Sequence, residues 1–344
     1  MEDRQQIGRD YYFDNLKGLL IFTVVFGHFL GRMQMYNDGA RTLYSFIYIF
    51  HMPLFILVSG YFSKKFRIDR IIDIMLVYII WQLIIYPIGF SLFSGKPIDN
   101  LPQTILYPRY SYWYLLSLIN WKLITPLLPK SYMTLLGIFI ISFIPSISHK
   151  VDWEFMSIGR TIGFYPFFYL GYLLDKESVK KICSKMPKFV SIVGIFLIII
   201  LSNYVFVEER VGVGFLFYKG SLGDYVSTDI GILIFRNICI FVTLFVILCI
   251  CSLVNDKKTP LTKWGQNTLV IYLTHAFILK SMKFTKGSLS LLTFLILAVC
   301  FVYGYCEVTS SNLVKKYVGV FTNFSTKKIF SKIKFKIRQP DIIS

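Results

Sequence analysis

The chain has 344 residues, of which 55% are hydrophobic and 16% charged, and its mean hydropathy is +0.59. Because charged residues make up roughly a quarter of a soluble domain, this composition excludes a soluble globular protein and favours a polytopic membrane protein. The net charge of +18 would suit nucleic-acid binding, but most Lys and Arg residues lie between apolar segments, so we expect no nucleic-acid partner.

Ten apolar segments are predicted to cross the membrane as helices, since most hold the roughly 20 residues that a bilayer requires. Pro126 and Pro129 interrupt the pattern between the fourth and fifth segments. With the N-terminus inside, the inner segments hold 24 Lys and Arg residues and the outer segments hold 10. This bias predicts an all-α protein of the cell (plasma or inner) membrane with both termini in the cytoplasm. The predicted spans are residues 14–36, 43–62, 69–93, 111–129, 131–148, 155–174, 188–207, 230–254, 264–281 and 287–314.

The first span carries three ionisable residues, Asp14, Lys17 and His28. Lys17 and His28 are eleven residues apart, which is within about 20° of three full helical turns, so they share one helix face roughly 16 Å apart. Asp14 projects within about 40° of the same line. Ionisable groups cost free energy in hydrocarbon and usually mark a site. We expect His28 near mid-depth and Lys17 near the cytoplasmic end, where it either orients a substrate or pairs with Asp14.

His51 in the second span is expected at a depth similar to that of His28, because the two are equidistant from a turn centred near residues 39 and 40. Two interpretations stay open. His51 either bonds a backbone carbonyl that Pro53 frees, or forms a second polar wall of the pocket that holds His28.

Four cations, Lys64, Lys65, Arg67 and Arg70, stand at the start of the third span. Arg67 and Arg70 are neighbours on a helix, and their guanidinium groups suit bidentate contacts with phosphate oxygens at a helix N-terminus. The alternative is the ordinary basic character of an inner loop.

Further polar residues lie within or beside later spans. Trp113 is either an interfacial anchor or a platform for a sugar. Glu154 and Arg160 open the sixth span, and Arg160 either reaches outward to the interface or neutralises an anionic group in a cavity. Arg236 and Glu307 are intramembrane charges for which the sequence identifies no partner.

His275 is the third histidine within a span, but no two histidines are three or four residues apart, so we expect no metal. The cysteines have neither a disulfide framework nor a metal-binding spacing and are predicted to be packing residues: Cys183, Cys239, Cys249, Cys251, Cys300 and Cys306. The basic tail after the last span is predicted to lie on anionic membrane lipids. No Walker-type nucleotide loop is present.

With these residues in order, the chain resembles the membrane-bound acyltransferase-3 family and, within it, the fucose 4-O-acetylase-like branch. The resemblance covers roughly residues 9–317. It rests on Phe13-Asp14-Asn15-Leu16-Lys17-Gly18 with Gly27-His28, Phe50-His51-Met52-Pro53-Leu54-Phe55 with Ser59-Gly60-Tyr61, Trp113-Tyr114-Leu115-Leu116, Arg160 with Phe164-Tyr165-Pro166-Phe167-Phe168 and Gly171, and Gly265-Gln266-Asn267-Thr268 with Tyr272-Leu273-Thr274-His275.

The family's first-helix pattern is a basic residue, ten others and a histidine, which Lys17 and His28 match, although many members have arginine at the first position. An Arg-x-x-Arg pair in the first inner loop also recurs in the family, and Arg67 and Arg70 match it. The resemblance implies ten or more spans and transfer of an acyl group, usually acetyl from acetyl-CoA, to a hydroxyl of a glycan or another envelope molecule. We therefore expect an acyltransferase domain at residues 1–317 and a basic cytoplasmic tail at 318–344.

A mechanism follows as a hypothesis. Histidine, with an unperturbed pKa of about 6.5, suits general-base catalysis, so His28 is expected to take the proton from the acceptor hydroxyl, with Lys17 and Asp14 beside it. Arg67, Arg70, Lys64 and Lys65 would hold the phosphates of acetyl-CoA. Arg160 would position the acceptor, and no residue is identified that would stabilise the oxyanion. The other candidates for acceptor binding are His51, Trp113, Glu154 and His275.

Two other classes of function explain the spans and intramembrane charges. One is a transporter or flippase of lipid-linked glycan, and the other is a non-catalytic partner of a polysaccharide or envelope assembly complex. The acceptor (capsule repeat unit, exopolysaccharide, teichoic acid or peptidoglycan), its side of the membrane, the acyl chain length and the oligomeric state stay open.

Overall fold

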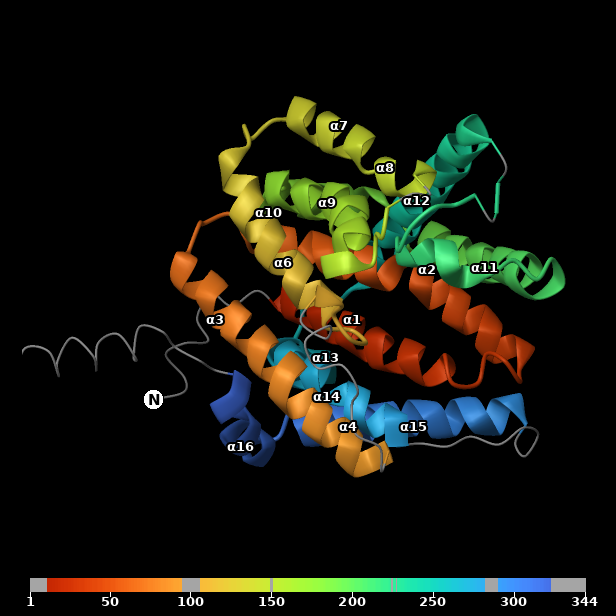
Figure 1. Ribbon diagram of the computed structural model, residues 1–344. Helices are drawn as coiled ribbons and strands as arrows, with labels where there is room; N and C mark the ends of the chain where they lie inside the picture. The colour runs from red at the N-terminus through yellow and green to blue at the C-terminus, as the bar shows by residue number, and fades with distance from the viewer. Residues whose placement is uncertain are drawn as a thin grey trace, which may run out of the picture.

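The computed structural model describes residues 11–94, 106–148, 151–223, 225–226, 228–281 and 290–322. Within these residues every regular element is a helix, which confirms the all-α fold class (Figure 1). The main helices are α1 (Tyr11–Leu30), α2 (Asp38–Tyr61), α3 (Ile68–Ile80), α4 (Tyr86–Ser94), α6 (Trp113–Ile124), α7 (Tyr132–Ile141), α8 (Ile144–Ile147), α9 (Ile158–Leu173), α10 (Lys176–Lys185), α11 (Lys188–Asn203), α12 (Asp229–Leu253), α13 (Pro260–Gln266), α14 (Thr268–Ser281), α15 (Leu291–Thr309) and α16 (Asn312–Thr322).

Short helical segments join or extend several of these helices. A π-helical turn, η2 (Trp81–Ile85), joins α3 to α4, and another, η5 (Tyr204–Glu208), extends α11. The remaining short segments are 3₁₀ turns: η3 (Thr125–Leu127), η4 (Phe155–Ser157) and η6 (Val213–Phe217).

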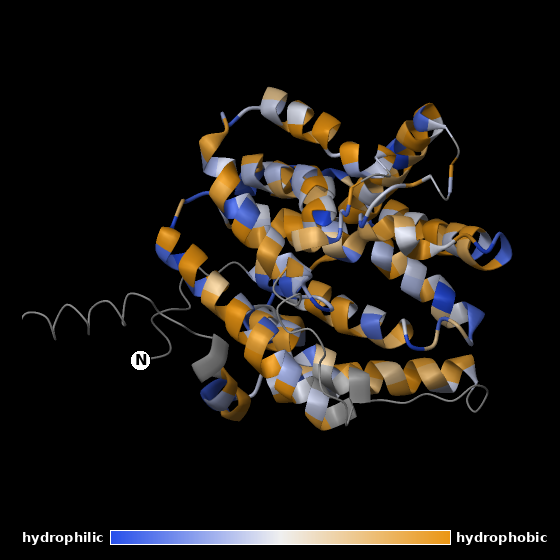
Figure 2. Cartoon of the chain, in the orientation of Figure 1, coloured by the Kyte–Doolittle hydropathy of each residue, from blue (hydrophilic) through white to orange (hydrophobic). Residues whose placement is uncertain are grey.

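Six helical runs in the described residues are long and apolar enough to cross a membrane, which supports a multi-pass membrane protein. They are Tyr11–Leu30, Asp38–Tyr61, Ile68–Gly89, Lys188–Glu208, Asp229–Leu253 and Leu291–Thr309. Hydrophobic residues run along these helices (Figure 2). The predicted count of ten is not confirmed, because the spans 111–129, 131–148, 155–174 and 264–281 contain shorter helices.

The shorter helices have identifiable breaks. The regular α-helix of α6 ends just before Pro126, and a 3₁₀ turn follows. Met156 and Ser157 have left-handed backbone conformations, with φ of 48° and 53°, so α9 begins only at residue 158. Asn267 separates α13 from α14. The predicted boundary between 1–317 and 318–344 falls inside α16, and most of the tail lies outside the described residues.

The helices define two ends of the bundle. The Asp14 end holds the start of α1 and the end of α2, where the rings of Phe13 and Tyr61 stack 4.3 Å apart. The His28 end holds the end of α1 and the start of α2. Other helices contribute residues to each end. At the His28 end, the Asn203 amide of α11 donates to the Thr42 hydroxyl. At the Asp14 end, the Tyr12 hydroxyl donates to the carbonyl of Cys251 in α12.

Helix α1 lies centrally and packs against α2, α13, α14 and α15 (Figure 1). Two crossings depend on glycine. A methyl group on Gly18 would overlap the carbonyl oxygen of Leu261 in α13, and one on Gly60 in α2 would overlap that of Phe168 in α9. Gly171 and Gly265 meet opposing backbone in the same way. These four glycines belong to the segments that carry the family resemblance, and they let the helix backbones approach closely.

The intramembrane charges without predicted partners are both satisfied. Arg236 is buried, donates to the carbonyl of Phe215 and the hydroxyl of Ser146, and lies 3.5 Å from the ring centre of Tyr218. Glu307 pairs with Lys263 and accepts the indole N–H of Trp264 at 2.8 Å. Both residues are therefore explained by packing between helices.

Candidate functional site

His28 lies in the last turn of α1, because the helix ends at Leu30. The predicted span of 14–36 therefore extends six residues beyond the end of the helix, and the mid-depth position of His28 stays a prediction. Its ring is half-buried, and its Nδ1 lies 3.3 Å from the Tyr48 hydroxyl. The rings of Tyr110 and His275 are centred 4.9 and 5.1 Å away. His28 is thus enclosed by aromatic and imidazole rings from α2, α14 and the residues before α6.

Tyr48 is the nearest partner of His28 from α2, and the sequence did not identify it. The predicted turn centre near residues 39 and 40 would place His51 opposite His28. In the structure Gly27 faces Tyr48, so His28 meets the residue one helical turn before His51. The rings of Tyr48 and His51 are 4.6 Å apart. Tyr48 and His51 are three residues apart and therefore neighbours on one helix face, and this spacing could have identified Tyr48 from the sequence.

His51 bears out parts of both predicted interpretations. Its Nδ1 lies 2.7 Å from the carbonyl oxygen of Ile47, and its ring also lines the cavity that holds His28. The carbonyl that Pro53 leaves without its helical donor belongs to Ile49, and the Thr243 hydroxyl donates to it at 3.1 Å. The bonded carbonyl is therefore not the one that proline frees.

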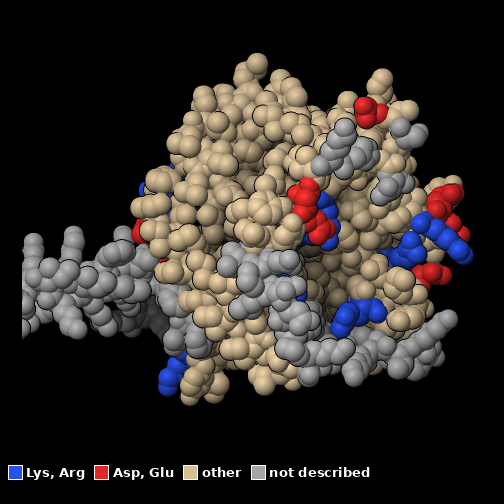
Figure 3. All heavy atoms as spheres, viewed as in Figure 1, with Lys and Arg blue, Asp and Glu red and all other residues tan. Residues whose placement is uncertain are grey.

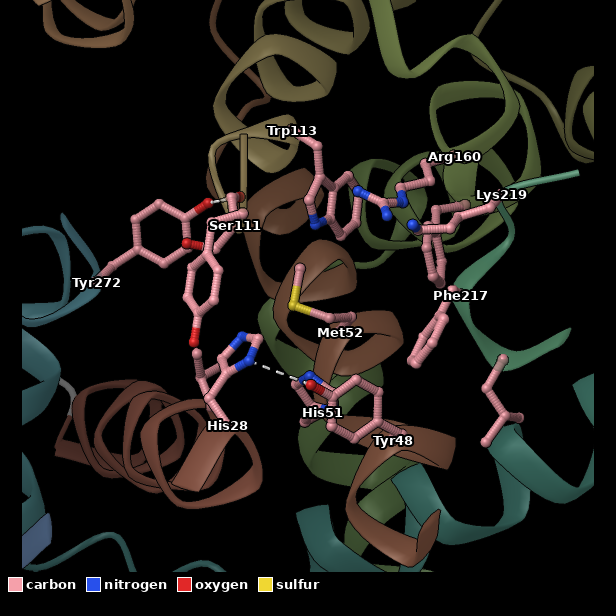
Figure 4. A pocket seen from close by; sticks show the side chains of 14 residues that line it. His28, Tyr48, His51, Met52, Ser111, Trp113, Arg160, Phe217, Lys219 and Tyr272 are labelled. Atoms are coloured by element: carbon pink, nitrogen blue, oxygen red, sulfur yellow. Dashed lines mark hydrogen bonds between the residues drawn. The ribbon is translucent and has the colours of Figure 1, made fainter. Parts of the chain in front are cut away.

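A cavity of about 150 Å³ opens beside His28, between α1, α2, α6, α9 and η6 (Figure 4). It brings together four of the predicted residues, His28, His51, Trp113 and Arg160. The Arg160 guanidinium lies 4.8 Å from the ring centre of Trp113 and across the cavity from His28 (Figure 4). The other lining residues are Val24, Tyr48, Met52, Tyr110, Ser111, Phe164, Leu216, Phe217, Lys219 and Tyr272.

A second, more polar cavity of about 280 Å³, which we call the vestibule, adjoins the first. The two share Tyr110, Arg160 and Lys219. Glu154 lines the vestibule and pairs with Lys219 at 3.0 Å, so this predicted residue reaches the site through a salt bridge. The face shown in Figure 3 is hollowed, with acidic and basic side chains at the rim. The remaining lining residues are Tyr107, Pro108, Trp153 and Ser157.

His275 is fully buried against His28 rather than exposed in the cavity. Its Nδ1 lies 2.5 Å from the carbonyl oxygen of Tyr272, which assigns the ring proton to Nδ1. Its Nε2 has no hydrogen-bond partner among the described residues. Within that part of the chain no three His, Cys, Asp or Glu residues form a group that would hold a metal.

Asp14 and Lys17 lie at the opposite end of α1 from His28. Their side chains pair at 2.8 Å, the Lys17 ammonium lies 5.3 Å from the ring centre of Phe62, and Gln266 donates to Asp14. Neither residue lines the cavity. Although Lys17 and His28 share a helix, we assign Lys17 to the ion pair that the sequence offered as the alternative to a substrate role.

The predicted phosphate-binding residues also lie at the Asp14 end. Arg67 and Arg70 are exposed, and each pairs with a carboxylate of its own helix, at 2.7 Å with Asp69 and 3.8 Å with Asp73. Lys64 lies over the Tyr61 ring and donates to the carbonyl of Leu174. Lys65 is exposed beside it. These four cations are neighbours, but none lines the cavity that holds His28.

Comparison with known proteins identifies the family of the chain. A family model described as an acyltransferase domain matches residues 10–306. The nodulation protein NolL of Sinorhizobium fredii is 29% identical over 181 residues, and that of Mesorhizobium japonicum is 31% identical over 183 residues. Each alignment covers 48% of this chain and 48% of the relative, so the similarity spans about half the length of these relatives. No solved structure matches the chain.

Proposed function

Because the chain belongs to the acyltransferase-3 family, we propose that it is a membrane O-acetyltransferase that uses acetyl-CoA. The proposed acceptor is a hydroxyl of a cell-envelope or exported polysaccharide, or of its lipid-linked repeat unit. The observation that carries the proposal is His28, whose imidazole lines a cavity together with Arg160 and Trp113. His28 supplies a base, and Arg160 and Trp113 supply a polar and an aromatic group that can orient a sugar.

Tyr48 would set the state of the His28 ring. Its hydroxyl contacts Nδ1 of His28, and its ring is centred 4.2 Å from that of Tyr44. If Tyr48 donates its proton to Tyr44, its oxygen accepts the Nδ1–H of His28, which leaves the lone pair on Nε2 of His28. That nitrogen then acts as the base.

The reaction would proceed by direct transfer. As the acceptor oxygen attacks the thioester carbon, Nε2 of His28 takes the hydroxyl proton. The tetrahedral intermediate then collapses, the carbon–sulfur bond breaks, and the imidazolium returns the proton to the departing thiolate of CoA. The products are the acetyl ester and CoA, and the imidazole is neutral again.

The donor and acceptor would meet from opposite ends of the bundle. The phosphates of acetyl-CoA are proposed to bind Arg67, Arg70, Lys64 and Lys65, and the pantetheine arm would run inward along α1. The path from Lys17 to His28 is roughly 16 Å along the helix, from a rise of about 1.5 Å per residue. The acceptor would enter through the vestibule, where Glu154 lies.

The test is acetyl transfer itself. Cells that express the chain, cells that lack it and cells with His28→Ala are compared by mass spectrometry of their surface glycans, with labelled acetyl-CoA supplied to membranes prepared from each. We expect a labelled acetyl group on glycan only with the unaltered chain. Glycan that changes sides of the membrane without gaining acetyl would instead support a flippase, and equal acetylation in all three would refute the proposal.

A further inference from the structure

Among the described residues, no protein oxygen accepts a hydrogen bond from the guanidinium of Arg160. Its guanidinium lies over the ring of Trp113 and is attracted by the charge of Glu154, but within the described residues no carboxylate comes within ion-pair distance of it. An arginine carries five N–H donors in a fixed plane, and donors removed from water without a partner cost free energy. Half-buried at the cavity wall, this group is free to bind a ligand.

Arg236 provides an internal comparison. It is also an arginine within the bundle, but it is 2% exposed, and backbone and hydroxyl oxygens accept its N–H groups. The fold therefore satisfies a buried guanidinium where the role is structural. At Arg160 it leaves the donors accessible to a cavity instead.

The carboxylates nearest to this wall are already engaged. Glu154 pairs with Lys219 at 3.0 Å. Asp152 accepts the Tyr107 hydroxyl at 2.5 Å and the backbone N–H of Glu154 at 3.1 Å, and the Tyr107 bond holds the pKa of Asp152 below its usual value. Glu154 attracts Arg160 electrostatically, but neither carboxylate is within ion-pair distance of it, so the N–H groups of Arg160 can bind an anion from outside the chain.

The position of Arg160 shows which substrate would bring that anion. Arg160 and Lys219 both line the inner cavity and the vestibule, so a ligand that enters through the vestibule passes two cations before it reaches His28. The vestibule also presents the rings of Tyr107, Tyr110 and Trp153, which suit packing against a sugar face. The cations proposed for the donor phosphates lie at the other end of the bundle.

Building on the proposed acetyltransferase function, we infer that the acceptor is an anionic sugar, whose carboxylate or phosphate binds Arg160 while a neighbouring hydroxyl reaches His28. Arginine binds either anion through two parallel hydrogen bonds, which fixes orientation as well as affinity. Lys219 would supply a second, weaker contact, because it already pairs with Glu154.

Three probes that differ only at carbon 6 test the inference without requiring acetyl transfer. Methyl β-glucoside carries a hydroxymethyl group there, methyl β-glucuronide a carboxylate, and the 6-phosphate of the glucoside a phosphate. Binding to the purified, detergent-solubilised full chain is measured by calorimetry at constant ionic strength. We expect at least one of the two anions to bind about tenfold or more tightly than the neutral sugar, because charge-assisted hydrogen bonds to arginine are stronger than neutral ones.

Variants assign the preference to the side chain. Arg160→Gln should abolish it, and Arg160→Lys should keep part of it, since the charge stays but the fork is lost. Arg41→Gln is the matched control, because Arg41 starts α2 at the same end of the bundle, donates to the carbonyl of Val211 and does not line either cavity. Its preference should match that of the unaltered chain.

Equal binding of the three probes, or a preference that Arg160→Gln leaves intact, would overturn the inference. So would a tenfold loss of acetyl-CoA affinity in Arg160→Gln, since the anion would then belong to the donor. If these binding results hold but no acetyl transfer occurs in the glycan assay, the proposed function fails while the anion site stands.

Discussion

The two ends of the bundle treat their charges differently. At the Asp14 end four cations pair with carboxylates: Lys17 with Asp14, Arg67 with Asp69, Arg70 with Asp73 and Lys263 with Glu307. At the His28 end, within the part of the chain that the structure describes, no carboxylate lies within ion-pair distance of Arg160 and Nε2 of His275 has no hydrogen bond. A charged residue in a membrane helix is therefore weak evidence for a functional site when considered alone. Polar groups left unsatisfied beside a cavity are stronger evidence.

This difference also bears on the donor. Phosphates that bind Arg67 and Arg70 have to compete with Asp69 and Asp73, and these exposed pairs contribute little stability, since water and salt screen surface ion pairs. Exchange of a carboxylate for a phosphate is thus inexpensive. The comparison predicts that variants at the His28 end change the chemical step, whereas those at the Asp14 end change donor binding or stability.

The largest effect is expected for His28. Replacement by Ala or by Gln should lower the rate of acetyl transfer by about 10²–10⁴-fold, because neither side chain can take the acceptor proton. Transfer is measured per amount of purified, monodisperse protein. Thr23→Val is the control, since Thr23 lies in the same helix and its hydroxyl donates to the carbonyl of Leu20 in the preceding turn. Near-normal transfer by purified His28→Ala would remove this residue from the mechanism.

Tyr48→Phe is expected to lower kcat by about tenfold, which corresponds to roughly 1.4 kcal/mol, with little change in KM. The ring stays packed beside His51, but the oxygen that orients the His28 imidazole is lost. Tyr114→Phe serves as the comparison, because it removes a hydroxyl that bonds Ser59 outside the cavity lining. Equal kcat in both variants would show that Tyr48 does not orient the base.

The double variant Arg67→Gln with Arg70→Gln should raise the KM for acetyl-CoA by about fivefold and leave kcat unchanged, because two exposed charge-assisted contacts are lost. The control, Lys180→Gln with Lys181→Gln, removes the same charge from α10, a helix with no buried residues. A change in the acceptor KM alone would show that the arginines do not hold the donor.

The smallest effect is expected for Asp14→Asn, which leaves Lys17 without its carboxylate. A partly buried ion pair of about 1 kcal/mol corresponds to a decrease in Tm of roughly 2 °C for a chain of this size. Transfer per folded molecule should stay within about twofold. A large loss of transfer at unchanged Tm would instead return Asp14 and Lys17 to the reaction itself.

Several features of the site could be predicted from the sequence. The intramembrane positions of His28, His51 and Arg160 marked them as candidates, and all three line one cavity. The contact of His275 with His28 could not be predicted, because it depends on how α14 packs against α1. Tyr48 was missed for a related reason, since the hairpin turn lies a few residues earlier than the pattern suggested.

The sequence by itself determined that this is a helical membrane protein of the acyltransferase-3 family, because hydropathy and short motifs are properties of neighbouring residues. The tertiary structure alone decided which ionisable groups are neutralised and which face a cavity. That outcome depends on contacts between residues far apart in the chain: Lys263 pairs with Glu307 on another helix, while the Arg160 guanidinium lies over the ring of Trp113 at the cavity wall.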